Sequence, residues 1–349
     1  MKSAFIILAV FLLTYFGIKL YLAWSLKKKI YAIPNERSSH SQPTPHGGGL
    51  VMVLVCLSAY FSYLYFTGQK IIWAYFIGAS IVALISWLDD LFSIRILWRV
   101  LCHSLAACIL LASVGFPQIF TFPLLGTYTV GAAGLLFWFL WIVFLINAYN
   151  FMDGIDGIAG TQALIAGIGW LIFGWIGGFL GVGYLGLIIA TSSFAFLLYN
   201  WQPAKIFMGD VGSTFLGYNF AVLPILAFNN NLVFTRKFWF ASVLLVWFFV
   251  FDASKTLLQR ALAGEKIWQP HREFLFHKLV IEGCQHKTVT LAYGILTVLI
   301  STLLLLYLNF GYPFNILTIF AVLFISVGLI IRVEFFNAPQ KRTQDEFSK

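Results

Sequence analysis

Residues 131–146 read GAAGLLFWFLWIVFLI, and residues 147–157 follow directly as NAYNFMDGIDG. The first stretch carries no charged residue and, with one or two more residues, is long enough to enter the hydrocarbon core of a bilayer. The second stretch places two carboxylates and two carboxamides at the end of that apolar run, where ionisable groups are costly and usually functional. The sequence therefore predicts a membrane helix that ends in a polar, functional loop.

The polar residues of this loop are of a kind that binds hard cations. If the segment continues as a helix, Asn150, Asp153 and Asp156 recur at intervals of three residues and share one face. Asp and Asn oxygens on one face suit Mg²⁺, which keeps part of its water shell and binds substrate phosphates. The alternative is a capped helix start, in which the same side chains bond orphan backbone amides and the glycines permit a turn.

Composition extends the membrane assignment to the whole chain. Of 349 residues, 60% are hydrophobic and 10% are charged, and the mean hydropathy is +0.89. Soluble domains carry about 25% charged residues. We therefore predict an all-α polytopic membrane protein with about eleven transmembrane helices, as one membrane domain over 1–332 and a polar cytoplasmic tail over 333–349. The predicted spans are 3–24, 48–66, 71–88, 98–114, 131–148, 160–177, 179–198, 213–228, 238–254, 288–308 and 314–331.

The distribution of Lys and Arg predicts the orientation, because cytoplasmic loops are enriched in these residues. Seventeen of them fall on one side and four on the other, so we expect the N-terminus outside and the C-terminus in the cytoplasm. The larger set is Lys27, Lys28, Lys29, Arg37, Arg95, Arg99, Lys205, Lys255, Arg260, Lys266, Arg272, Lys278, Lys287, Arg332, Lys341, Arg342 and Lys349, and the smaller set is Lys2, Lys70, Arg236 and Lys237.

The net charge of +9 is mostly this orientation signal, with some attraction for anionic lipid or substrate. No loop carries a basic and aromatic platform, so we expect no nucleic-acid partner. The four cysteines lack the spacing of a metal site.

Unusual polar residues gather in the loops predicted to face the cytoplasm. The first such loop ends in His46-Gly47-Gly48-Gly49, and a glycine run can expose backbone amides to a phosphate, or simply give a flexible start to the helix. The second holds Asp89-Asp90, two carboxylates that repel each other unless a cation or a proton lies between them. One could bind metal and the other accept a proton, or both could be solvated at the membrane boundary.

Further inner loops add anion-binding and base-stacking groups. Arg99 lies about two and a half turns after Asp90 and could neutralise a phosphate. Asp210 lies between two glycines and is interpreted as a cation ligand, because Ser213 or Thr214 could cap the following helix instead. Phe207 could stack on a base, although most Phe residues here are expected to be core or lipid-facing.

The last and longest inner loop, about 255–287, offers an imidazole beside a guanidinium at His271-Arg272, a suitable clamp for a diphosphate. His271 and His277 are six residues apart, which is not the spacing of a helical zinc pair.

Taken together, five segments resemble the polyprenyl-phosphate N-acetylhexosaminyl-1-phosphate transferase family, glycosyltransferase family 4. Its members include the translocase that makes the first lipid intermediate of peptidoglycan and the enzymes that initiate O-antigen synthesis. The resemblance rests on the His46-Gly-Gly-Gly start, the Asp89-Asp90 pair, Asn150-x-x-Asp153-Gly-x-Asp156-Gly, Phe207-x-Gly-Asp210-x-Gly-Ser213 and the final His/Arg loop.

This resemblance implies a transferase of the bacterial inner membrane with its active site at the cytoplasmic face. Its expected substrates are a UDP-N-acetylhexosamine and undecaprenyl phosphate. Its expected cofactor is Mg²⁺, with Mn²⁺ as a substitute. Membrane lipid is a further expected partner, and a second copy of the chain could join it in a homodimer. Phe274 stands near where a further His is expected, which departs from the enterobacterial and peptidoglycan branches of the family. The stretch through Leu279-Val280 and His286-Lys287 looks closer to the O-antigen initiators that accept UDP-GlcNAc or its 6-deoxy relatives.

The resemblance also implies roles for individual residues. Asn150 and Asp210 would bind Mg²⁺, and Asp156 and Phe207 would face the uracil. The expected catalytic residues are Asp89, Asp90 and Asp153, with the first two beside the lipid phosphate. The other expected substrate-binding residues are His46, Gly47, Gly48, Arg99, His271, Arg272 and His277.

Two other classes of protein remain open from the residues alone. A membrane prenyltransferase also holds Mg²⁺-diphosphate on helix ends, but it would need two Asp-rich helices with Asp-x-x-x-Asp spacing. A multi-pass transporter would need polar residues near the middle of the membrane and on both faces.

Overall fold

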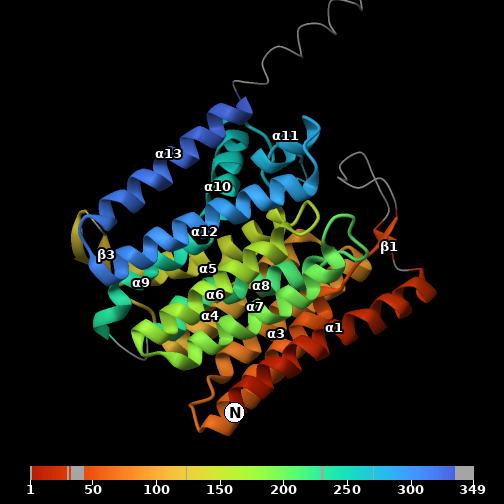
Figure 1. The fold of residues 1–349 in the computed structure, drawn as a ribbon, viewed down its shortest axis with the longest axis horizontal. Helices are drawn as coiled ribbons and strands as arrows, with labels where there is room; N and C mark the ends of the chain where they lie inside the picture. The colour runs from red at the N-terminus through yellow and green to blue at the C-terminus, as the bar shows by residue number, and fades with distance from the viewer. Residues whose placement is uncertain are drawn as a thin grey trace, which may run out of the picture.

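The computed structural model describes residues 2–29, 31–32, 43–122, 124–228, 232–269 and 271–334, which form a helical bundle with two short strand pairs (Figure 1). The helices are α1 (Lys2–Lys28), α2 (Gly49–Thr67), α3 (Trp73–Phe92), α4 (Ile96–Val114), α5 (Ala133–Met152), α6 (Ile158–Gly177), α7 (Leu180–Asn200), α8 (Asp210–Phe228), α9 (Leu232–Leu245), α10 (Trp247–Leu262), α11 (Leu275–Ile281), α12 (His286–Phe310) and α13 (Phe314–Glu334). Antiparallel pairs form between β1 (Tyr31–Ala32) and β2 (Thr44–Pro45), and between β3 (Ile119–Phe122) and β4 (Gly126–Thr129).

Within the described residues, ten helices are long and apolar enough to cross a membrane. The pair α9 and α10 passes the same test together but is bent by 79° at its break, which brings the number of spans to eleven if the pair is one span. The predicted all-α polytopic membrane fold is therefore confirmed.

Three details of the fold go beyond what the predicted spans specify. The span 238–254 is two helices rather than one straight helix. Much of the predicted loop 255–287 is helical, because α10 continues to Leu262 and α11 follows it. The segment between α4 and α5 carries the β3–β4 pair. Most of the predicted tail, residues 335–349, lies outside the described residues.

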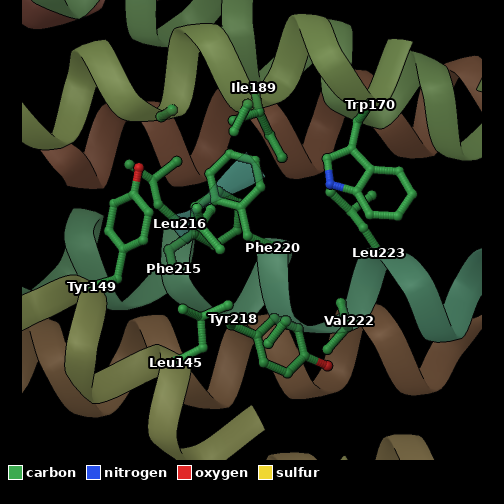
Figure 2. Packing of buried hydrophobic residues seen from close by; sticks show 14 of the residues in the cluster. Leu145, Tyr149, Trp170, Ile189, Phe215, Leu216, Tyr218, Phe220, Val222 and Leu223 are labelled. Atoms are coloured by element: carbon green, nitrogen blue, oxygen red, sulfur yellow. The ribbon is translucent and has the colours of Figure 1, made fainter. Parts of the chain in front are cut away.

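Helix α8 lies in the middle of the bundle (Figure 1). Every residue from Val211 to Ala227 is buried, and Figure 2 shows its side chains packed against Leu145 and Tyr149 of α5, Trp170 of α6 and Ile189 of α7. Because lipid tails are as apolar as leucine, close contact rather than the hydrophobic effect holds such helices together.

Glycines bring the backbone of α8 close to two neighbouring helices. A Cβ atom on Gly49 of α2 would lie 2.3 Å from the Cα of Gly212, and one on Gly217 would lie 2.7 Å from the carbonyl oxygen of Leu145 in α5. Small residues at helix contacts permit this approach. The N-terminal end of α8 is thereby fixed against α2, beside the polar loops.

The turn between α5 and α6 differs from the helical continuation that we considered. Helix α5 ends at Met152, Asp153 takes the C-cap position, and Gly157 adopts a φ of +78° before α6 begins. Asn150, Asp153 and Asp156 therefore do not share a helical face. They converge because the chain turns back, not because of the helical period.

Candidate active site

A cavity of about 360 Å³ lies where the C-terminal ends of α3, α5 and α7 meet the N-terminal ends of α8 and α12. It has residues from β1, α11 and the loops before α2, α6 and α8 in its wall. Its lining is Ala32, His46, Asp90, Asn150, Asp153, Gly154, Ile155, Asp156, Asn200, Phe207, Met208, Gly209, Asp210, Ser213, His277 and His286.

The cavity brings together most of the residues that the sequence indicated. The predicted residues in its wall are His46, Asp90, Asn150, Asp153, Asp156, Phe207, Asp210 and His277. The predicted residues that do not line it are Gly47, Gly48, Asp89, Arg99, His271 and Arg272. Segments as distant in sequence as residues 46 and 286 thus form one acidic site.

Asp90 caps the start of α8. Its carboxylate accepts the backbone N–H of Asp210 at 2.9 Å and that of Val211 at 3.1 Å. The first N–H groups of a helix have no partner within the helix, and a carboxylate there is favourable. Gly209, with a φ of +77°, leaves room for this carboxylate, because a Cβ there would lie 2.7 Å from Asp90 Oδ2. Asp90 therefore anchors α3 to α8 at the site.

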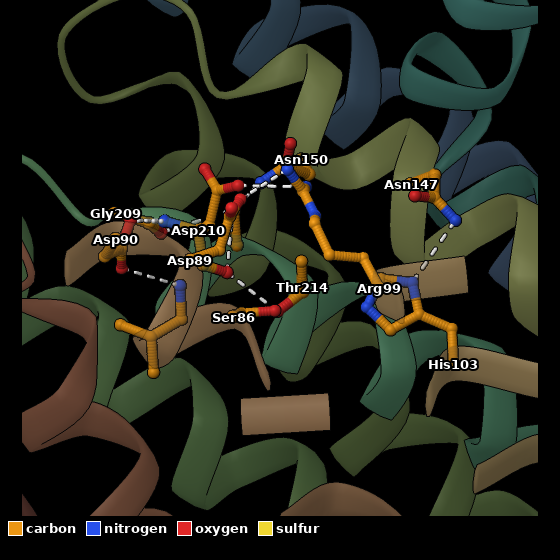
Figure 3. A network of polar contacts seen from close by, with 12 residues as sticks. Ser86, Asp89, Asp90, Arg99, His103, Asn147, Asn150, Gly209, Asp210 and Thr214 are labelled. Carbon is orange, nitrogen blue, oxygen red and sulfur yellow. Dashed lines mark hydrogen bonds and ion pairs between the residues drawn. The ribbon is translucent and has the colours of Figure 1, made fainter. Parts of the chain in front are cut away.

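Arg99 joins two carboxylates from different helices. Its guanidinium forms an ion pair with Asp89 of α3 and another, at 2.9 Å, with Asp210 of α8. Figure 3 shows Arg99 reaching from α4 toward Asp210 and Asn150. This bridge differs from the phosphate contact that we expected of Arg99, since both ends of its planar fork already hold protein carboxylates.

The backbone amides of the glycine run bond protein groups rather than the phosphate that we expected. Gly48 donates its N–H to the carbonyl of Phe207 at 3.0 Å, and Gly49 donates to that of Met208 at 2.8 Å. In return, the N–H of Phe207 bonds the carbonyl of Pro45 at 2.8 Å. Because these N–H groups already bond the loop before α8, Gly48 and Gly49 do not present them to a phosphate. Their pairing instead sets the position of Phe207 and of the segment leading to Asp210.

Negative charge is concentrated in the cavity wall. Burial, together with the negative charges of Asp210, Asp90 and Asp156, raises the pKa of Asp153 to about 7. Like charges that are held together in this way favour a bound cation or a shared proton.

A divalent cation fits this donor set only with outside ligands. Asn150 donates its amide N–H to Ser213 Oγ at 3.0 Å, which leaves the amide oxygen as an acceptor, and Asp210 adds carboxylate oxygens from α8. In the described part of the chain, no group of three or more His, Cys, Asp or Glu could hold a metal. Such a sparse set suits Mg²⁺, which is commonly held by one or two carboxylates, waters and substrate phosphates.

Helix α11 closes one side of the cavity. The buried Asp252 of α10 accepts the backbone N–H groups of Leu275 at 2.8 Å and Phe276 at 3.3 Å, at the start of α11. Tyr293 of α12 donates its hydroxyl to the same carboxylate at 3.0 Å. This arrangement presents His277 to the cavity, where Gly154 leaves room for it, because a Cβ there would lie 2.7 Å from His277 Nε2.

His277 is a neutral imidazole. Burial lowers its pKa to about 3, and the charge of the nearby Arg272 adds to the effect. Its Nδ1 has no hydrogen-bond partner among the described residues. The rings of Phe276 and Phe274 pack near its imidazole, with centroids 4.0 and 5.8 Å from that of His277.

Sequence reasoning gave no role to several residues at or near the cavity. Asn200 and His286 line it, and so does Ser213, which we considered only as a cap for the following helix. For His286, its position in a His-bearing loop was the available signal. His103 of α4 is fully buried one turn from Arg99, with its Nδ1 3.5 Å from the amide nitrogen of Asn147 (Figure 3). A histidine inside an apolar span was the available signal for it.

Ten spanning helices and an acidic cavity at their ends define a polytopic membrane enzyme. Comparison with known proteins makes the class specific: residues 72–228, from α3 to α8, match the model of glycosyl transferase family 4. This match and the relatives described next make the chain similar to glycosyl transferase family 4 over most of its length.

Curated relatives extend the match beyond that region. The chain is 27% identical over 262 residues, 73% of its own length and 70% of the other's, to a probable undecaprenyl-phosphate N-acetylglucosaminyl 1-phosphate transferase of Bacillus subtilis. It is 28% identical over 311 residues, 80% of its length and 77% of the other's, to a decaprenyl-phosphate N-acetylglucosaminephosphotransferase of Mycobacterium leprae. A phospho-N-acetylmuramoyl-pentapeptide-transferase of Shouchella clausii is 40% identical over 73 residues, 19% of this chain and 22% of that one.

Proposed function

We propose that this protein transfers an N-acetylhexosamine-1-phosphate, from UDP-GlcNAc or a 6-deoxy relative, to undecaprenyl phosphate and releases UMP. The observation that carries the proposal is the acidic cavity at the helix ends, lined by residues of all five segments that resemble the transferase family. The names of the relatives supply polyprenyl phosphate and N-acetylglucosamine phosphate as the substrate class. By the resemblance of the last loop, the product would start an O-antigen or a related lipid-linked surface glycan.

The reaction is a displacement at phosphorus. An oxygen of the lipid phosphate forms a new bond to the phosphorus that bears the sugar, and the bond from that phosphorus to the bridging oxygen of UMP breaks. UMP leaves with the electron pair, and the bond between the sugar and its phosphate is untouched. Phosphoryl transfer of this kind needs positioning and electrostatic stabilisation rather than a covalent step on the protein.

The residues of the cavity suit separate parts of this reaction. Asn150 and Asp210 would hold Mg²⁺, which when bound neutralises the diphosphate and stabilises charge on the departing UMP. Asp153 would accept the proton that a monoprotonated lipid phosphate brings. Asp156 and Phe207 would bind the uridine.

For some of the predicted site residues, we propose other roles than those expected from the sequence. Arg99 and Asp89 would order the carboxylate of Asp210 rather than bind phosphate, because they already pair with each other and with Asp210. His277 would approach the diphosphate as a neutral group, while His271 and Arg272 would act from behind the cavity wall.

The test is release of UMP by the purified protein in detergent. We expect release only when UDP-GlcNAc, undecaprenyl phosphate and Mg²⁺ or Mn²⁺ are all present, and loss of release with EDTA. Asp210→Asn and Asn150→Ala should abolish turnover in folded protein, whereas Asn309→Ala, at the far end of α12 and exposed, should not.

Other results would exclude the proposal. Full turnover in a metal-free sample would remove Mg²⁺ from the site. Release of inorganic diphosphate from a prenyl diphosphate, with no use of UDP-sugars, would make the protein a prenyltransferase instead.

A further inference from the structure

The first turn of α12 holds Asp156 at three atoms. His286, the first residue of α12, places its Nδ1 3.4 Å from both the backbone nitrogen and Oδ1 of Asp156. One turn later, Thr290 donates its hydroxyl to the Asp156 carbonyl oxygen at 2.8 Å. Both side chains are buried, and His286 lines the cavity beside Asp156.

The loop before α8 holds Asp156 from another direction. Ala204 donates its backbone N–H to Asp156 Oδ2 at 3.1 Å. Next along the chain, the N–H of Gly157 bonds the side-chain oxygen of Asn200 at 2.9 Å. The carboxylate is therefore oriented by two elements, one at each oxygen. An ionised carboxylate can accept about four hydrogen bonds, so acceptor capacity remains for a donor group of a ligand in the cavity.

The contact of His286 does not depend on which ring nitrogen carries the proton. With hydrogen on Nδ1, the imidazole donates to Asp156 Oδ1. With Nδ1 bare, it accepts the Asp156 backbone N–H instead. In both tautomers the ring fixes Asp156 through Nδ1 and leaves Nε2 out of that contact.

We infer that His286 and Thr290 are positioning residues for Asp156, and that they set its carboxylate to accept an N–H of the nucleotide base. The inference rests on the proposed function, which gives Asp156 the uridine. A uracil attached to ribose has one N–H donor, which an acceptor-only carboxylate recognises. Because this part of the donor substrate does not react, a misplaced Asp156 changes mainly the KM for the UDP-sugar.

Two substitutions of His286 separate positioning from a mere packing role. Asn carries its amide nitrogen on Cγ, as His carries Nδ1, whereas Gln places its amide farther out, near the position of Nε2. We expect His286→Gln to raise the KM for UDP-GlcNAc on the order of tenfold with little change in kcat, the scale for partners that orient a binding side chain. His286→Asn should stay within about threefold of the wild type, because it keeps the contact at Nδ1.

Thr290 gives an independent pair of variants in case His286 variants fail to fold. Thr290→Val has nearly the same shape but cannot donate to the Asp156 carbonyl, and we expect the same rise in KM. Thr290→Ser keeps the hydroxyl and should stay near the wild type. Thr288→Ala is the matched control, because Thr288 is exposed on the same turn of α12.

Equilibrium binding of UMP to each purified variant separates failure of this inference from failure of the proposed function. If the wild type neither binds UMP nor turns over UDP-GlcNAc, the proposed function fails. If the wild type is active and His286→Asn is impaired as strongly as His286→Gln, the positioning role is wrong. Additive effects of His286→Gln and Asp156→Asn in the double variant would also overturn it, since a residue that acts through Asp156 has no effect to add once Asp156 is changed.

Discussion

Arg99 bridges two carboxylates at the edge of the acidic site. It lies between Asp89 and Asp210, and it is mostly buried, with 18% of its side chain exposed. Without its charge, two partly buried carboxylates would face each other with no cation between them. Arg99 therefore holds Asp210 by an ion pair at the wall of the cavity.

We expect Arg99→Ala to lower the free energy of unfolding by about 2–3 kcal/mol, because it leaves charged partners unpaired. Arg99→Lys should recover part of this stability but not full activity, since an ammonium cannot bond both carboxylates as a planar fork does. Thermal unfolding in detergent and UMP release measure the two effects. Arg95→Ala, one turn earlier and exposed, is the control; equal behaviour of the Arg95 and Arg99 variants would contradict the bridge.

The lowered pKa of His277 makes the free energy of unfolding depend on pH. Its pKa in the folded protein is about 3, whereas the unperturbed value is about 6.5. Between these values the unfolded chain binds the proton and the folded protein does not, so stability falls as pH decreases below about 6.5.

From pH 7 to pH 5, this residue alone should cost about 2 kcal/mol of stability. His277→Gln removes the titrating group, so its unfolding temperature should fall less than that of the wild type over the same pH interval. Melting curves at the two pH values provide the measurement. Equal falls for both proteins would show that His277 is protonated in the folded state.

Among single residues, the types that form the site were predictable but many of their contacts were not. The resemblance to the transferase family placed Asp90 beside the lipid phosphate, and two adjacent carboxylates at a membrane boundary made the position stand out in the sequence. Its role as a helix cap depends on the amides of Asp210 and Val211, 120 residues later in the chain. No local pattern specifies such a partner, whereas the cost of a charged group near lipid is visible in the sequence itself.

At the scale of helices, glycine positions determine how closely α2 and α8 approach. Gly49 begins α2, and the atoms nearest to a Cβ there belong to the backbone of Gly212. Backbone cannot move aside as a flexible side chain can, so this contact would push the two helices apart. The shift would reach the N-terminal end of α8, where Asp210 lies.

Gly49→Ala should therefore destabilise the protein by about 1–3 kcal/mol, the range for overpacking, and reduce turnover. Gly328→Ala in α13 is a matched control, because nothing lies within 4 Å of a Cβ at that position. Unfolding temperatures of the two variants give the comparison. A Gly49→Ala protein as stable as Gly328→Ala would show that α2 and α8 are not in tight contact.

Helix positions followed from apolar runs, but helix ends and the broken span did not. Residues 238–254 are almost uniformly apolar, which favours one straight span. The break after Leu245 is supported from α6, where Gln162 donates its amide N–H to the Leu245 carbonyl at 2.6 Å. An unpaired carbonyl in a membrane helix is costly, so a distant side chain permits a break that the local sequence does not indicate.

At the scale of the whole molecule, the distribution of Lys and Arg predicts which side of the membrane the cavity faces. UDP-sugars are cytoplasmic, so the cavity has to face the cytoplasm for the proposed reaction. In a variant without the four native cysteines, a cysteine placed within 232–235 should react with an impermeant thiol reagent in intact cells. One placed at Gln269 should react only after lysis. The reverse pattern would place the cavity on the wrong side of the membrane.

An isotope experiment tests directly whether the sugar is transferred together with its phosphate. UDP-GlcNAc labelled with ³²P only at the phosphate that bears the sugar is incubated with the purified protein and undecaprenyl phosphate. We expect the label to appear in the lipid product and the released UMP to be unlabelled. Label remaining in the released nucleotide, as UDP, would show transfer of the sugar alone and would contradict the account.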